Sequence, residues 1–442
     1  MNKVGRQIYD VIVTGAGPSG MMAAISASSE GANVLLLEKN PSPGKKLLLT
    51  GHGRCNITNI RIMDNFRETY HENARFLTSA LHAFSPEDVR AFFASIGIPT
   101  HEEDAGRIFP DSQKASDVCR ALEDAVRKNG IELLMESPVT SVSPAKDPSG
   151  DLWCVKTNDS EYTGRSVVIA SGGKSFPHTG STGDGYRIAE DLDHEITPIR
   201  PALAPLFLAS FSDPMTDRCE DCGAEFTLAG VTLPDVGTAL SVDGKTVARS
   251  RGDLLFTHQG VSGPSAMSLS RYLPTDTGKY PEGKVRLIVD LLPDISEEEV
   301  GKNLLSAMTD NPNRHMKRLL CETFHFQEKI ALLLLGETMD LSANQVTKKM
   351  RNQITEKIKR CSFDIEKCTP LDMAYVTAGG VSVRQIDPKT MGSKVKEGLF
   401  FCGEVIDIDG VSGGYNLQNA WSTGRAAGLA AASFSRREER RE

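Results

Sequence analysis

The feature that most constrains this chain is a glycine-rich turn after its first apolar strand. Residues 10–20 read DVIVTGAGPSG, and a helix of small residues and a second apolar strand, Val34 to Leu37, precede the acid Glu38. In such a unit the glycines allow a tight turn, close approach to a pyrophosphate and close helix packing. The helix N-terminus also attracts phosphate. This order of elements predicts a bound dinucleotide. Its predicted contacts are Gly15, Gly17, Pro18, Ser19, Gly20, Glu38 and Lys39.

Size and composition exclude several classes of protein. The chain has 442 residues, more than one hydrophobic core usually serves, so two or three domains are expected. A net charge of −8 argues against a general nucleic-acid-binding protein, and no stretch approaches the roughly eighteen consecutive apolar residues of a membrane span. The odd number of cysteines, nine, favours reduced thiols, and the polar N-terminus leaves no room for a signal peptide. We therefore expect a cytoplasmic protein without nucleic-acid or membrane partners.

The distribution of strands and helices predicts an α/β protein with an inserted domain. Residues 1–195 and 369–442 contain apolar strands bounded by glycine, as in a buried parallel sheet. Short β-rich runs at 196–292 indicate a small antiparallel sheet or barrel, and 293–360 are helical in pattern. We expect a Rossmann-like cofactor-binding domain with a central parallel sheet, which a β-barrel-like and helical domain at 196–368 interrupts.

Further segments are candidates for contact with the same cofactor. The run at 44–59 is a glycine-flanked loop soon after the ribose-binding acid. Strands at 167–170, 376–378 and 399–402 each end in glycines, and a second helix begins after the double glycine at 413–414. The residues that we expect at the cofactor in these segments are Lys46, Thr50, Gly51, Arg54, Cys55, Asn56, Ser171, Gly172, Gly173, Gly403, Glu404, Gly413, Gly414, Tyr415, Asn416 and Leu417.

The second helix end indicates which dinucleotide is bound. Glu404 could accept hydrogen bonds from ribityl hydroxyls, and the helix that begins at 414–416 would place its positive end near N1 and the C2 carbonyl of a reduced flavin. No second strand–G-x-G-x-x-G–helix unit is present for a nicotinamide domain. One dinucleotide with two such helix ends, far apart in the sequence, fits FAD better than a nicotinamide cofactor.

The chain resembles the two-dinucleotide-binding-fold flavoproteins and, more narrowly, the BaiN-like, aminoacetone-oxidase-like family of FAD-dependent oxidoreductases. The segments that carry this resemblance span nearly the whole chain: 15–20, 51–59, 255–264, 377–381, 390–394 and 403–418. The resemblance implies an inserted domain and a 51–56 loop beside the flavin ring. It also implies FAD contacts at Glu38, Asn56, Val139 (through its backbone, to adenine), Gly173, Gly403, Glu404 and Asn416. Members include an amine oxidase and reductases of steroid-like or unsaturated substrates, so the resemblance leaves the substrate open.

Several side chains allow both a functional and a structural interpretation. His258 could be a general acid or base above the flavin, or a structural hydrogen-bonding group, and Arg54 is a second candidate catalytic residue. Cys55 could be a nucleophile, but no paired cysteine is visible nearby. Cys219 and Cys222 form a C-x-x-C pair, but a four-cysteine zinc site needs a second pair, so we expect no metal.

These observations predict an FAD-dependent oxidoreductase that transfers a hydride between a small organic substrate and flavin N5. The expected redox partner is O2 or a transiently bound NAD(P)H. Two alternatives stay open. One is a fumarate-reductase-like reductase of an unsaturated substrate, with Arg249, Arg251 and His258 as candidate acids or carboxylate-binding groups. The other is a non-catalytic flavoprotein, either a redox sensor or an RNA-associated factor whose FAD is structural, although the acidic net charge counts against RNA.

Overall fold

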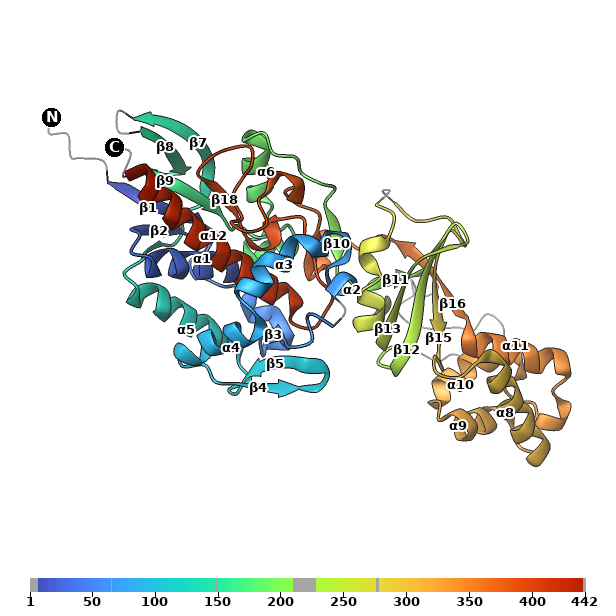
Figure 1. Cartoon of the computed structure of the whole chain (residues 1–442). Coiled ribbons are helices and arrows are strands. Elements are labelled where there is room, and N and C mark those ends of the chain that lie inside the picture. Colours follow the sequence, from blue (N-terminus) through green and yellow to red (C-terminus); the bar gives the residue numbers. More distant parts are fainter. Residues whose placement is uncertain (1–6, 65, 148–149, 210–227, 276–277, 440–442) are drawn as a thin grey trace. The chain divides into compact units, whose positions relative to one another are not determined.

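The computed structural model describes residues 7–64, 66–147, 150–209, 228–275 and 278–439 (Figure 1). The chain divides into two compact units. Unit 1 comprises Met1–Pro201 and Ala374–Glu442, and unit 2 comprises Ala202–Met373. Both limits of unit 2 lie a few residues further along the chain than those of the predicted insert, 196–368.

Unit 1 is built on a seven-stranded sheet in the order β6-β2-β1-β9-β8-β7, with β18 also paired to β9. Strands β6, β2, β1, β9 and β18 are parallel, and β7 and β8 extend the sheet in antiparallel fashion. Val11, Ile12 and Val13 are fully buried, as expected for a parallel sheet covered on both faces. The strands are β1 (Ile8–Thr14), β2 (Val34–Leu37), β6 (Glu132–Leu134), β7 (Val139–Asp147), β8 (Gly150–Thr157), β9 (Glu161–Ile169) and β18 (Leu399–Phe401).

Two helices from opposite ends of the chain run side by side against this sheet. In Figure 1 the C-terminal helix α12 (Tyr415–Glu439) lies along α1 (Pro18–Ser29). Their backbones approach so closely that a Cβ added at Gly424 would collide with the carbonyl oxygen of Ser19. This packing brings the N-termini of both helices into the same half of unit 1. The other helices of the unit are α2 (Phe66–Tyr70), α3 (Ala74–Ala83), α4 (Pro86–Ser95), α5 (Ala115–Lys128) and α6 (Asp184–Asp191).

Two small sheets complete unit 1. A three-stranded antiparallel sheet has the order β3-β5-β4, and β10 pairs with β17. The smaller sheet lies where the chain leaves unit 1 and returns to it. Their strands are β3 (Thr58–Asn59), β4 (Thr100–Glu103), β5 (Arg107–Pro110), β10 (Arg200–Ala202) and β17 (Val376–Ala378).

Unit 2 combines a closed six-stranded barrel, in the order β11-β14-β13-β12-β15-β16, with a group of helices. The barrel interior and the helices share one hydrophobic core. Its strands are β11 (Leu206–Leu208), β12 (Thr232–Val242), β13 (Lys245–Thr257), β14 (Gly260–Ser262), β15 (Val285–Asp290) and β16 (Cys361–Lys367). Its helices are α7 (Pro264–Met267), α8 (Glu297–Asp310), α9 (Met316–Phe324), α10 (Glu328–Leu335) and α11 (Lys348–Lys359). The predicted fold class, a Rossmann-like parallel sheet interrupted by a barrel and helices, is confirmed.

Candidate functional site

A pocket in unit 1 opens at the carboxyl ends of the parallel strands. Gly15 follows β1, Glu38 follows β2 and Ser171 follows β9, and all three line the pocket. Asn416 and Leu417, from the first turn of α12, line it as well. Open α/β sheets bind their ligands at this edge, because the strand ends and the helix N-termini that follow them meet there. The N-termini of α1 and α12, which are far apart in the sequence, therefore meet at this pocket.

Many of the predicted cofactor contacts line this pocket. They are Gly15, Gly17, Pro18, Ser19, Glu38, Lys39, Lys46, Thr50, Val139, Ser171, Gly172, Glu404, Asn416 and Leu417. The predicted contacts that do not line it are Gly20, Gly51, Arg54, Cys55, Asn56, Gly173, Gly403, Gly413, Gly414 and Tyr415. Sequence reasoning missed Asn40, Tyr375 and Asn419, which also line it. Asn40 and Asn419 lie within three residues of predicted contacts, and Tyr375 directly precedes the candidate strand at 376–378.

The glycine turn has the backbone geometry of a phosphate site. Gly17 is the N-cap of α1, and no side chain caps the helix there. A Cβ at Gly17 would meet no heavy atom within 4 Å, so the helix N-terminus is open on this side. Gly15 has a φ of 99°, and a Cβ at Gly20 would collide with the Gly15 carbonyl oxygen. Gly15 and Gly20 thus shape the turn, and Gly17 leaves room in front of it.

The carboxylate of Glu38 is held against this turn. Glu38 is 6% exposed, and its Oε2 accepts a hydrogen bond of 2.8 Å from the backbone N–H of Ala16. Oε1 accepts hydrogen bonds from the backbone and side-chain nitrogens of Asn40, at 2.8 and 2.7 Å. Each carboxylate oxygen can accept about two hydrogen bonds, so Oε2 can still accept one from a ribose hydroxyl.

The lysine after Glu38 is engaged by an ion pair. Lys39 Nζ donates to Asp184 Oδ2 at 2.6 Å and to Thr182 Oγ1 at 2.5 Å. Partial burial raises the pKa of Asp184, but the hydrogen bonds from Lys39 and Thr182 outweigh this effect and hold the pKa below its usual value. Lys39 therefore lies in the pocket wall as half of a salt bridge.

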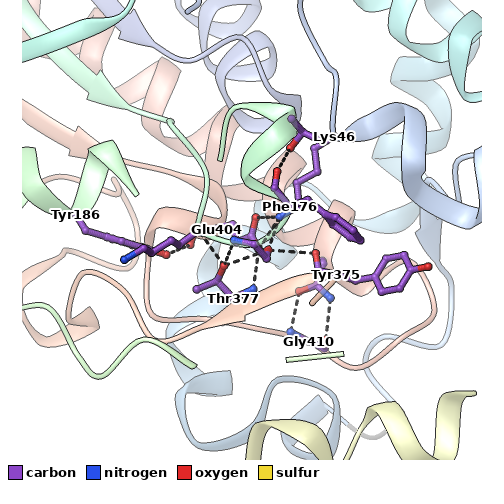
Figure 2. A network of polar contacts seen from close by, with 11 residues as sticks. Lys46, Phe176, Tyr186, Tyr375, Thr377, Glu404 and Gly410 are labelled. Atoms are coloured by element: carbon purple, nitrogen blue, oxygen red, sulfur yellow. Dashed lines mark hydrogen bonds and ion pairs between the residues drawn. The ribbon is translucent and has the colours of Figure 1, made fainter. Parts of the chain in front are cut away.

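A polar network around Glu404 links four segments of unit 1 (Figure 2). Lys46 Nζ donates to both carboxylate oxygens of Glu404, at 3.1 and 2.8 Å, and the backbone N–H of Thr377 donates to Oε1 at 2.8 Å. Thr377 Oγ1 in turn accepts hydrogen bonds from the backbone N–H groups of Lys174 and Ser175. The Lys46 and Glu404 side chains are each about one fifth exposed, at 22% and 21%. The network thus fixes a charged pair in the pocket wall.

Buried polar atoms without a protein partner occur at the same pocket. Among the described residues, these include Ser171 Oγ and Asn419 Oδ1, which belong to the wall. Asn56 Oδ1 is a third, and it lies 2.8 Å from the position of a Cβ at Gly414, beside the start of α12. A buried polar atom without a partner costs about 1–3 kcal/mol. A polar ligand that supplies the missing hydrogen bonds therefore fits this donor and acceptor set.

The predicted flavin loop has an unusual backbone. Gly51, His52, Gly53 and Cys55 have φ values of 56°, 56°, 84° and 65°. Cys55 is fully buried, and burial raises the pKa of its thiol to about 12. The thiol is therefore protonated at neutral pH, which favours the structural interpretation of this cysteine. The Arg54 side chain points to Glu103, and its Nη1 donates a hydrogen bond of 2.8 Å to Glu103 Oε1.

The other candidate side chains belong to unit 2 or lie outside the described residues. His258 is exposed in the turn between β13 and β14, and Arg249 is exposed on β13. Arg251 is held by hydrogen bonds to two carboxylates, Asp235 and Asp294. Cys219 and Cys222 lie outside the described residues. Within the described part of the chain, no cluster of His, Cys, Asp and Glu could hold a metal ion, and no helix has the length and apolarity needed to cross a membrane.

The pocket brings together the glycine turn after β1, the acid after β2 and the start of α12, as in a Rossmann-type flavoprotein. The chain belongs to the HI0933-like family, whose Rossmann-domain model matches residues 9–430. The protein is an FAD-dependent oxidoreductase, as the sequence predicted. The predicted family resemblance is likewise confirmed.

Several relatives match over almost their full length. A 3-dehydro-bile acid delta(4,6)-reductase of Clostridium scindens is 31% identical over 436 residues, which is 98% of this chain and 99% of the relative. A ribosomal RNA dihydrouridine synthase of Escherichia coli is 32% identical over 417 residues, or 94% and 96% of the two chains. A solved 3-ketosteroid delta1-dehydrogenase from Sterolibacterium denitrificans is 15% identical, with a TM-score of 0.49 over 96% of this chain and 99% of that one.

Proposed function

We propose that the protein reduces a carbon–carbon double bond conjugated to a carbonyl group in a small organic substrate. The observation that supports this most is a property that the Clostridium scindens and Escherichia coli relatives share. One is named for reducing the delta-4,6 bonds of a 3-oxo bile acid, and the other for converting uridine to dihydrouridine. In both cases the double bond is conjugated to a carbonyl, which makes its far carbon a hydride acceptor. FAD, when bound, supplies this hydride chemistry.

The pocket residues divide the work of holding the cofactor. We assign the pyrophosphate to the N-terminus of α1 at Gly17, and the adenosine ribose to the remaining acceptor capacity of Glu38. Val139 takes the adenine end. The Lys46–Glu404 pair and the N-terminus of α12 take the flavin end, with the loop at 51–55 nearby. The positive end of α12 would stabilise negative charge on the reduced ring.

A transiently bound NAD(P)H is the proposed electron donor. Reduction of a double bond consumes two electrons and two protons, so the holoenzyme needs a reductant in every turnover. The sequence holds one strand–G-x-G-x-x-G–helix unit, which the proposal assigns to FAD. The nicotinamide would therefore approach an open flavin face and leave before the substrate binds.

A second candidate substrate is a uridine of ribosomal RNA, which the name of the Escherichia coli relative favours. The chemistry would be the same, because the uracil double bond is conjugated to a ring carbonyl. The net charge of −8 favours the small molecule, since RNA binding normally uses a basic surface.

The first test follows the flavin colour under anaerobic conditions. NADH or NADPH is expected to bleach the purified holoenzyme. A 3-oxo-delta-4 steroid should then restore the colour and gain two mass units, whereas a primary amine should not bleach the oxidised enzyme. Bleaching by the amine, or reoxidation by O2 but by no unsaturated carbonyl compound, would overturn the proposal. A uridine-containing ribosomal RNA fragment run in parallel decides between the two substrates.

Tyr375 offers an aromatic surface for an apolar substrate at the flavin end of the pocket. Tyr375 is 43% exposed, and its ring meets that of Phe176 edge-on, with 5.1 Å between the ring centroids. Figure 2 shows both residues beside the network of Glu404. Loss of such a contact corresponds to about a tenfold change in affinity. Tyr375→Ala is therefore expected to raise the steroid KM about tenfold with little change in kcat. Met63→Ala is the control, because Met63 is 47% exposed and does not line the pocket. A fall in kcat at unchanged KM would contradict this role.

A further inference from the structure

The loop at 51–55 needs support from outside the pocket. His52 and Cys55 have φ values of 56° and 65°, a left-handed conformation that is unfavourable for residues with a Cβ. Thr50, immediately before the loop, lines the pocket, and its carbonyl oxygen accepts a hydrogen bond of 3.0 Å from the backbone N–H of Cys55. The conformation of the loop therefore determines where the pocket wall lies at Thr50.

Arg54 connects this loop to the sheet formed by β3, β5 and β4. Its Nη1 donates to Glu103 Oε1 at 2.8 Å and to Gln113 Oε1 at 3.0 Å, and its guanidinium lies 4.1 Å from the centroid of the Phe109 ring. Phe109 is buried, and its Cε1 lies 3.1 Å from the position of a Cβ at Gly51. The Phe109 ring thus supports both Gly51, at the start of the loop, and Arg54.

Glu103 is the anion that holds Arg54 in this place. Its Oε1 accepts the hydrogen bond from Arg54 and another of 3.2 Å from Gln113 Nε2. The Glu103 side chain is 25% exposed and that of Arg54 is 37% exposed, so the pair is only partly shielded from water. Arg54 does not line the pocket, which favours an indirect role for this arginine.

We propose that Glu103 is a positioning residue for the flavin: it holds Arg54 on Phe109 and thereby keeps the 51–55 loop and Thr50 in place beside the cofactor. This inference rests on the proposed placement of the flavin end of FAD. In this proposal Arg54 links Glu103 to the loop and does not itself contact the substrate.

The test compares Glu103→Gln with Glu102→Gln in the holoenzyme. Glu102 precedes Glu103 on β4, so its side chain lies on the other face of the strand, and it is exposed. Glu103→Gln is expected to change the visible circular dichroism of bound FAD, to weaken FAD binding about fivefold and to lower kcat more than it raises KM. The thermal unfolding midpoint without FAD should stay near that of the wild type. Glu102→Gln should change none of these quantities.

A double-mutant cycle separates positioning from a general loss of stability. If Glu103 acts through Arg54, the double variant should bind FAD about as weakly as Arg54→Met alone, because Glu103→Gln has no further effect once Arg54 is gone. Gln113→Ala removes the second acceptor of the Arg54 guanidinium. It should shift the flavin spectrum in the same direction as Glu103→Gln, but by a smaller amount. An unchanged flavin spectrum and FAD affinity in Glu103→Gln would overturn the inference. So would an equal loss of FAD affinity when Glu103→Gln is made in the wild type and in Arg54→Met. The flavin spectrum and the FAD affinity need no substrate, so they decide the inference even where double-bond reduction fails.

Discussion

Gly17→Ala is expected to fold like the wild type and to bind FAD about a hundredfold more weakly, whereas Gly20→Ala should lose stability itself. The two glycines differ in what a methyl group would meet. At Gly17 the φ of −79° suits any residue and no heavy atom lies within 4 Å, so the protein without cofactor has room for it. The methyl group would instead occupy space proposed for the pyrophosphate. At Gly20 it would collide with the Gly15 carbonyl, which we expect to cost about 3 kcal/mol.

The two outcomes are measured separately. Thermal unfolding of the FAD-free proteins reports the free energy of unfolding, and fluorescence titration with FAD reports affinity. Gly301→Ala, in the middle of α8 with its nearest neighbour at 3.7 Å, is the control and should change neither by much. Wild-type FAD affinity in Gly17→Ala would show that the pyrophosphate does not lie at the N-terminus of α1.

Glu38→Ala is expected to weaken FAD binding about thirtyfold and to destabilise the FAD-free protein by about 1–2 kcal/mol. The first effect is the loss of a charged acceptor for the ribose. The second arises because the N–H groups of Ala16 and Asn40 lose their buried partner. Glu38→Gln keeps the length of the side chain but loses its charge and one acceptor oxygen, so it should have a smaller effect on both quantities.

FAD content after purification and titration of the FAD-free protein are the measurements for this pair. Asp159→Asn, in the exposed turn between β8 and β9, removes a carboxylate of unit 1 away from the pocket and is the control. Full FAD occupancy and unchanged affinity in Glu38→Ala would exclude Glu38 as the ribose ligand.

Much of the pocket could be predicted from local sequence, because its parts are ends of elements. Gly15, Glu38 and Ser171 each follow an apolar strand, and such strands in a parallel sheet bring their carboxyl ends to one edge. The second helix end was visible as a double glycine before Asn416. Local patterns of this kind can be recognised in the sequence because each one fixes a known backbone geometry.

Side-chain partners were not predictable in the same way. Lys46 pairs with Glu404, 358 residues further along the chain, and Arg54 turns to Glu103 on a separate small sheet. Tyr375 lines the pocket, although the sequence marked only the strand that follows it, at 376–378. These contacts depend on how distant segments pack against each other, and no local sequence pattern shows that packing.

The sequence by itself determined the fold class, the FAD cofactor and the two helix ends that point to it, because each follows from a short pattern with a fixed backbone geometry. Only the tertiary structure decided that Glu404 is held by Lys46 and Thr377, that Arg54 pairs with Glu103, and that Cys55 is a buried, protonated thiol. The physical reason is that charge pairing and burial are properties of neighbours in space, and those neighbours come from segments that meet only when the sheet has formed.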